Sequence, residues 1–255
     1  GFGGREPWEP EYPAMGANID YYFGSAPSGE VTLEIMDASG MLIRRLSSEG
    51  PGETTTVEPS MREMMMVTMG TPRLPKGAGA HRFTWDLLHP GPWAANAGQA
   101  GRRGPMVVTG QYKARISTGD WSDTQWFEVK MDPRVTATGI SYREVVAQRD
   151  LAMEVRDALS EARMAAAELI AAQESGRGGE RTQEALAELR EKMVTAPVRY
   201  SRPMLVDQLS YLYGNLLGAD QEPGADAFTR YTELRALLDD YAQQLERLLR
   251  SVTED

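Results

Sequence analysis

The apolar residues change their spacing once along the chain, at Asp132-Pro133, and this change divides the sequence into two regions. Before it, apolar and polar residues alternate, as in residues 31–36, which is the pattern of a half-buried strand. After it, apolar residues recur every three or four positions, which is the pattern of an amphipathic helix. We therefore predict a two-domain α+β protein: an antiparallel Ig-like β-sandwich over 17–132, followed by an antiparallel bundle of about four amphipathic helices over 133–255.

Three segments do not follow either pattern. Residues 1–16 are rich in Gly, Pro and Glu and are predicted to form an extended arm. Residues 59–76 and 89–105 are predicted to be long loops within the sandwich. Both exceed the usual length of a connection, so each is expected to be functional or disordered.

Helix boundaries in the second region have clear local signals. Ser141 and Glu144 form a capping-box pattern, which predicts a helix from there to about Ser175. Shorter helices are predicted over 182–194 and from near Pro203, the latter residue in the first turn. The last predicted helix covers about 226–252. Its expected inward seam has a heptad-like spacing: Phe228, Tyr231, Leu234, Leu238, Tyr241, Leu245, Leu248 and Val252.

Composition and motifs argue against catalysis. The chain has no cysteine, which excludes disulfides and thiolate chemistry, and its net charge of −10 argues against binding to nucleic acid. The two histidines, His81 and His89, lack the partners of a zinc site. No nucleophile elbow, phosphate loop or dinucleotide-binding motif is present, and no apolar run is long enough to span a membrane. We expect no enzyme activity, no catalytic residue, no cofactor and no metal site.

The residues most expected to bind a partner are methionines and aromatic residues in the irregular segments. Methionine side chains adapt to apolar surfaces, and their thioethers also suit Cu(I). The loop 59–76, which we call the methionine-rich loop, could therefore pack on its own domain, dock onto a protein or lipid, or bind copper. Trp93, in the loop 89–105, could bind a partner or cover an open end of the sandwich. The candidate partner-binding residues are Met61, Met64, Met65, Met66, Met69, Trp93, Trp8 and Tyr12.

Several short motifs occur in an order that matches a known family. They are ANIDYYF (17–23), VTLEIMD (31–37), HRFTWDL (81–87) with Pro90-Gly91-Pro92, GQY (110–112) and VKMDPR (129–134). With these motifs, residues 13–160 resemble the region after the β-propeller in bacterial sortilin-like (VPS10) and BNR-repeat proteins, often labelled glycosyl hydrolases. The resemblance implies an Ig-like or fibronectin-like sandwich with a helical tail, an exported or envelope location and a binding role. No propeller lies in this sequence, so no catalytic residue of the family is carried over.

Together these observations favour an accessory role. The first hypothesis is a scaffold subunit that docks, through protein–protein contacts, onto a larger bacterial envelope assembly such as a membrane-embedded respiratory, photosynthetic or secretion complex. It would lie on the periplasmic or extracellular face, without a transmembrane span of its own. The alternative is a carbohydrate-binding or structural C-terminal module of a sortilin-like or BNR-repeat glycosidase, with Trp93 or Trp121 contacting glycan. The Gly-rich start agrees with an expectation that the chain is part of a longer product.

Overall fold

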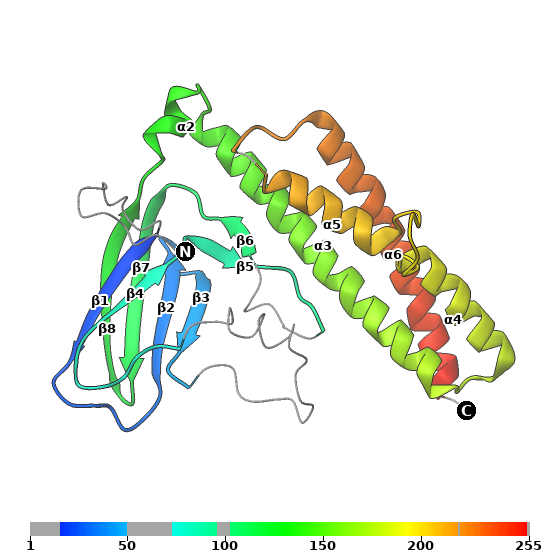
Figure 1. The fold of residues 1–255 in the computed structure, drawn as a ribbon, viewed down its shortest axis with the longest axis horizontal. Helices are drawn as coiled ribbons and strands as arrows, with labels where there is room; N and C mark the ends of the chain where they lie inside the picture. Colours follow the sequence, from blue (N-terminus) through cyan, green and yellow to red (C-terminus); the bar gives the residue numbers. More distant parts are fainter. Residues whose placement is uncertain (1–15, 50–72, 96–102, 219, 254–255) are drawn as a thin grey trace, which may run out of the picture.

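The computed structural model describes residues 16–49, 73–95, 103–218 and 220–253. In these residues the chain is a mixed α+β protein with antiparallel sheets and five helices, and all strands precede all helices (Figure 1). We call the two parts the strand region and the helical region. The elements are β1 (Ala17–Phe23), β2 (Val31–Asp37), β3 (Leu42–Ser47), β4 (Gly79–Trp85), β5 (Leu88–Pro90), β6 (Arg103–Met106), β7 (Gly110–Thr118), β8 (Trp121–Val129), α2 (Pro133–Ala137), α3 (Tyr142–Ser175), α4 (Gly179–Met193), α5 (Leu205–Leu216) and α6 (Ala225–Thr253).

The strands form one larger and two smaller antiparallel sheets. The larger sheet has the order β3-β2-β7-β8, while β1 pairs with β4 and β5 pairs with β6. The pairing of β7 with β8 runs without a bulge from Gly110↔Val129 to Thr118↔Trp121. Since β8 lies at the end of the sheet order, one of its two sides has no paired strand within the described residues.

One apolar core lies between the larger sheet and the β1–β4 pair. Trp85 of β4 is fully buried there, and its indole N–H donates to the carbonyl of Leu88 at 3.2 Å. The rings of Tyr112 and Phe127 meet Trp85 edge-on, with centroids 5.9 and 6.1 Å away. Phe127 packs against this core, whereas the adjacent Trp126 is 57% exposed. In β2, where apolar and polar residues alternate, Val31, Leu33 and Ile35 are fully buried, as the pattern predicts.

The capping box predicts the start of α3 correctly. Ser141 Oγ accepts the Glu144 backbone N–H, and the Glu144 carboxylate accepts the Ser141 backbone N–H. These two bonds satisfy N–H groups that have no partner within the helix. The helix ends at Ser175, and its C-cap Gly176 has a φ of 65°, a left-handed conformation that glycine adopts without a side-chain clash.

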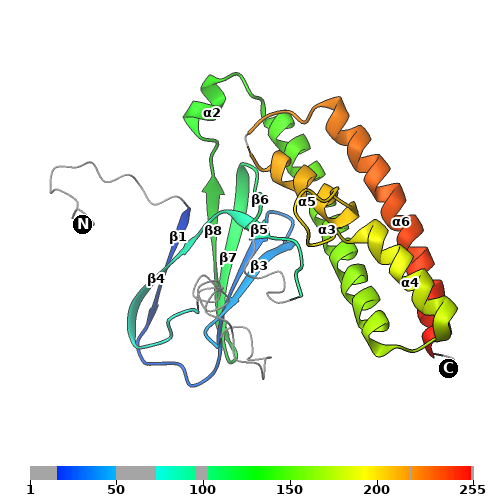
Figure 2. The same cartoon turned by 45° about the vertical axis from the view of Figure 1, so that its right-hand side comes forward.

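Of the four long helices, α3 lies nearest the strands, and α4 and α6 lie on its far side (Figures 1 and 2). α3 contacts α4, α5 and α6, and two apolar clusters fill the spaces between them. The apolar residues that recur every three or four positions in α3, α4 and α5 are buried, as expected for amphipathic helices. They are Leu151, Val155, Leu159, Ala162, Ala166 and Leu169 in α3; Leu186, Leu189 and Met193 in α4; and Leu205, Leu209, Leu212 and Leu216 in α5.

Some sequence predictions differ from the structure. In α6 the predicted inward Phe228 is 45% exposed, because Ala227 and Tyr231 occupy the inward positions before Leu234. The predicted loop 89–105 begins and ends in paired strands, β5 and β6, which its Pro and Gly content concealed. Pro203 precedes α5, whose N-cap is Met204. The short helix α2 was not predicted. Of the predicted arm and the loop 59–76, only residues 16 and 73–76 are described.

Candidate functional site

Three arginines of α3 lie on the side of the helix that faces the strands. Arg149, Arg156 and Arg163 are seven residues apart, which is close to two helical turns, so their side chains share one face. Arg156 Nη1 donates to the Pro90 carbonyl at 3.3 Å, and Arg163 Nη1 donates to the Trp93 carbonyl at 3.1 Å. We call these three residues the arginine row. Through Arg156 and Arg163 it connects the helical region to the main chain at the end of β5 and just after it.

Three more hydrogen bonds complete this junction. The Trp93 backbone N–H donates to Ser160 Oγ at 3.0 Å, and the Ser160 hydroxyl donates to the Arg156 carbonyl at 2.9 Å. On α5, the Tyr213 hydroxyl donates to the Arg103 carbonyl in β6 at 3.1 Å. On the strand side, the hydrogen bonds of Arg156, Arg163, Ser160 and Tyr213 go to backbone atoms of the segment around β5 and β6. These bonds do not depend on which side chain the bonded residue of that segment carries.

His89 of β5 lies buried beside the arginine row. It is 9% exposed, and its Nε2 has no hydrogen-bond partner within the described residues. Burial, and then the positive charges of Arg149 and Arg156, lower the pKa of His89 to about 4, against a weaker opposing effect of Asp37. The imidazole is therefore neutral near pH 7.

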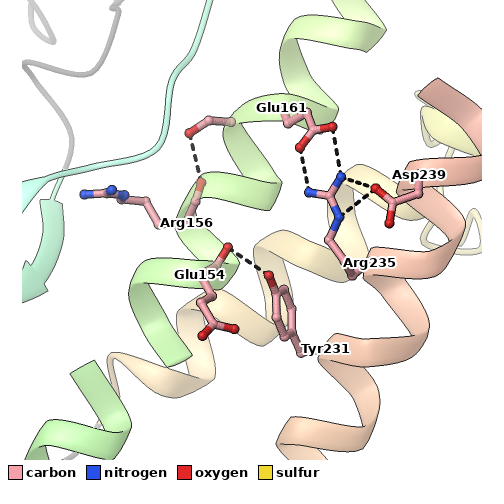
Figure 3. Close-up of polar contacts among 7 residues, drawn as sticks. Glu154, Arg156, Glu161, Tyr231, Arg235 and Asp239 are labelled. Atoms are coloured by element: carbon pink, nitrogen blue, oxygen red, sulfur yellow. Dashed lines mark hydrogen bonds and ion pairs between the residues drawn. The ribbon is translucent and has the colours of Figure 1, made fainter. Parts of the chain in front are cut away.

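The other face of α3 is joined to α6 (Figure 3). The Arg235 guanidinium donates to both oxygens of Glu161, at 2.6 and 2.9 Å, and also to Asp239 of its own helix. The carboxylates of Glu161 and Asp239 raise the pKa of Arg235, and the hydrogen bond from Arg235 lowers the pKa of Asp239. Tyr231 reaches the Glu154 carbonyl at 3.5 Å. α3 thus contacts the strand region with Arg156 and α6 with Glu161, from different sides (Figure 3).

The sequence-predicted partner-binding residues fall in two groups. Trp93 lies at the junction, half-buried, with its backbone N–H and carbonyl both bonded to α3. Its contact with a partner stays a prediction. The other candidates lie outside the described residues: Met61, Met64, Met65, Met66, Met69, Trp8 and Tyr12.

Two exposed tryptophans lie on β8, the last strand in the order of the larger sheet. Trp126 is 57% exposed, with Lys113 Nζ 4.5 Å from its ring centroid, and Trp121 is 50% exposed. Trp121 and Tyr22 border an open cavity of about 590 Å³ that is also lined by Ser25 and Thr118. Aromatic rings beside hydroxyl groups can contact a sugar through its apolar face and its polar groups.

A larger groove of about 820 Å³ lies in the helical region, between α5 and the start of α6. Tyr211, Asp207 and Arg230 are among its lining residues, and Tyr211 is 73% exposed. Within the described residues, no group of three His, Cys, Asp or Glu side chains could hold a metal ion. The His81 Nε2 atom instead lies within hydrogen-bond distance of the Gly77 carbonyl, at 2.7 Å.

Sequence reasoning missed the arginine row. Its only signal was the repeat of arginine at seven-residue intervals in a predicted helix, and nothing in the sequence named the backbone carbonyls that accept these bonds. No family model, curated protein or solved structure matches this chain. Among the helices of the described residues, none has a stretch long and apolar enough to cross a membrane.

Proposed function

We propose that the chain is a non-catalytic scaffold subunit, in which an Ig-like β-sandwich is fixed to an antiparallel helical bundle and docks onto a larger assembly of the bacterial envelope. The arginine row carries this proposal. Hydrogen bonds from charged groups contribute roughly 1.5–3 kcal/mol each, so the bonds of Arg156 and Arg163 to main-chain carbonyls would resist rotation of the two parts.

The dimensions of the helical region support the same role. α6 has 29 residues, and at 1.5 Å per residue it is about 44 Å long. If a helix of this length is held at a constant angle to the larger sheet, the helical region and the β8 side of that sheet can present two separate surfaces to a partner. We infer that the partner is a protein complex and that the subunit lies on the periplasmic or extracellular face.

The rigidity of the junction can be measured directly because the chain has no cysteine. Asp123→Cys on β8 and Glu191→Cys on α4 place one spin label on each part, both at exposed positions. We expect a narrow distance distribution that broadens when Arg156→Met and Arg163→Met are combined. Arg250→Met is the matched control, because Arg250 is 71% exposed and pairs only with Glu246 of its own helix in the described residues.

Docking is tested by purifying the tagged full chain from solubilised native membranes. We expect the wild-type chain to copurify with other subunits in a stable complex. The variant that combines Arg156→Met with Arg163→Met should give a lower yield of this complex than Arg250→Met does. A monomer that brings no stoichiometric partner would contradict the scaffold proposal.

Binding of a carbohydrate is the second candidate function, and the cavity between Trp121 and Tyr22 favours it. A glycan array probed with the full chain tests it. Trp121→Ala should abolish the signal, whereas Trp126→Ala, on the same strand but outside that cavity, should not. An array without hits would exclude this function.

A further inference from the structure

The segment between α4 and α5, residues 194–204, exposes an aromatic and an apolar side chain next to two arginines. We call it the connector. Tyr200 is 90% exposed and Val198 is 67% exposed. Arg199 and Arg202 are exposed beside them, and the connector contains no acidic residue. A single exposed side chain is ordinary on a protein surface. Here an exposed valine, an exposed tyrosine and two exposed arginines occur together within residues 198–202.

Hydrogen bonds within the connector hold this arrangement in place. The Met204 backbone N–H donates to Thr195 Oγ1 at 2.9 Å, which closes the base of the segment. The Ser201 hydroxyl lies 2.8 Å from the Ala196 carbonyl and 2.6 Å from the Val198 carbonyl. The exposed side chains are therefore presented by an internally bonded loop, so less conformational entropy would be lost on binding.

Tyr200 itself has a strained backbone. Its φ of 66° is in the left-handed region, which for a residue other than glycine costs on the order of 1–3 kcal/mol. The guanidinium carbon of Arg199 lies 5.1 Å from the centre of the Tyr200 ring, within the range of a cation–π contact. This backbone conformation costs energy, yet it places the Tyr200 ring in solvent, where the ring gains no packing within the described residues. We therefore infer that the exposed ring has a binding role.

The charge of the connector is opposite to that of the chain. The net charge of the whole chain is −10. Yet Arg199, Arg202 and the neighbouring Lys192 form no ion pair within the part of the chain that the structure describes. Arginine and tyrosine are also the residues that most often dominate the energy of protein interfaces. A surface complementary to the connector would supply carboxylates and an apolar recess.

We propose that the connector docks into an acidic recess of a partner protein, where Tyr200 is the inserted anchor and Arg199 and Arg202 pair with carboxylates. This inference deepens the proposed scaffold function and rests on it. A lipid bilayer fits less well. Electrostatic anchoring to a bilayer uses clusters of roughly 4–8 basic residues, whereas the connector has two, Arg199 and Arg202.

The test is photo-crosslinking with the full chain in its native cells. Benzoylphenylalanine replaces Tyr200 in one variant and Tyr211, which is 73% exposed on α5, in a second. We expect an adduct from position 200 on a partner segment rich in Asp and Glu, and little from position 211. Combining Arg199→Gln with Arg202→Gln should lower the yield about tenfold, because charge-assisted bonds to carboxylates are lost. The corresponding lysine substitutions should restore part of it.

Other outcomes overturn the inference. These are an adduct with lipid, an adduct with a second copy of the chain, an adduct on a segment without carboxylates, or a yield that the Arg→Gln changes leave unaltered. If the wild-type chain still purifies within a complex but position 200 gives no adduct, the connector inference fails and the scaffold function stands. If the wild-type chain brings no partner at all, the scaffold function fails first.

Discussion

Lowering the pH should lower the free energy of unfolding through His89, which lies on the strand side of the junction. The folded state lowers the pKa of this histidine from its ordinary value of 6.5 to about 4, by burial and by the charges of Arg149 and Arg156. Below pH 6.5 the unfolded chain therefore binds a proton that the folded chain does not bind until about pH 4. The free energy of unfolding must fall as the pH is lowered through this window.

The magnitude follows from the two pKa values. One pKa unit corresponds to about 1.36 kcal/mol, so the full difference between 6.5 and about 4 corresponds to about 3 kcal/mol. At pH 4.5 about 2.5 kcal/mol of this should already be lost, because the unfolded histidine is then almost fully protonated and the folded one only partly. This is a large fraction of the net stability of a typical domain.

The assay has two parts. The chain has only two histidines, so the imidazole NMR signals can be assigned with a His81→Gln variant and titrated individually. Urea unfolding at pH 7 and pH 4.5 then gives the stability of the wild type and of His89→Leu. The leucine variant should lose about 2.5 kcal/mol less than the wild type between the two pH values.

The comparison with His89→Leu at each pH cancels the titration of carboxylates that both proteins share. The reasoning would be refuted by a His89 signal that titrates near pH 6.5. It would equally be refuted by a leucine variant that loses as much stability as the wild type.

Further predictions concern the helices and the β5–β6 pair. Ser141→Ala removes the N-cap of α3 and should cost about 1 kcal/mol in urea unfolding, with Ser141→Thr as the neutral control. Leu238→Ala, at a fully buried position, should cost about 2–5 kcal/mol and lower the midpoint of thermal unfolding; an unchanged midpoint would contradict the packing of α6. Arg235→Met should cost at most about 1 kcal/mol, because its pair with Glu161 is partly solvated, and high salt should reduce that difference. Gly104→Ala would place a Cβ 2.1 Å from the main chain of β5, so amide exchange in β5 and β6 should accelerate while that in α6 does not.

The sequence predicts those features of the fold that depend on local patterns. Alternation identified the inward faces of β2 and β7, and the Ser141–Glu144 pair located the start of α3 because both of its bonds lie within four residues. β5 and β6 escaped prediction because they are only three and four residues long and contain proline. Their pairing is stabilised by partners elsewhere in the chain.

The candidate sites were less predictable for a related reason. The arginine row contacts carbonyl oxygens, which every residue carries, so no complementary sequence motif exists for its acceptors. The exposure of Tyr200 depends on how the connector closes, through Thr195 and Ser201, and not on a periodic pattern. The methionine-rich loop was the more conspicuous signal, but its methionines lie outside the described residues.

Because carbonyl oxygens are the acceptors at the junction, the junction's hydrogen bonds can tolerate some substitutions in the segment that they hold. Arg156 and Arg163 hold Pro90 and Trp93 by atoms that substitutions do not remove. At the half-buried Pro90 and Trp93 a change of side chain would leave the acceptor carbonyl in place, although the buried Gly91, Pro92 and Ala94 beside them restrict which side chains fit. Binding specificity could be rewritten on one part without disturbing the geometry by which the other part is presented.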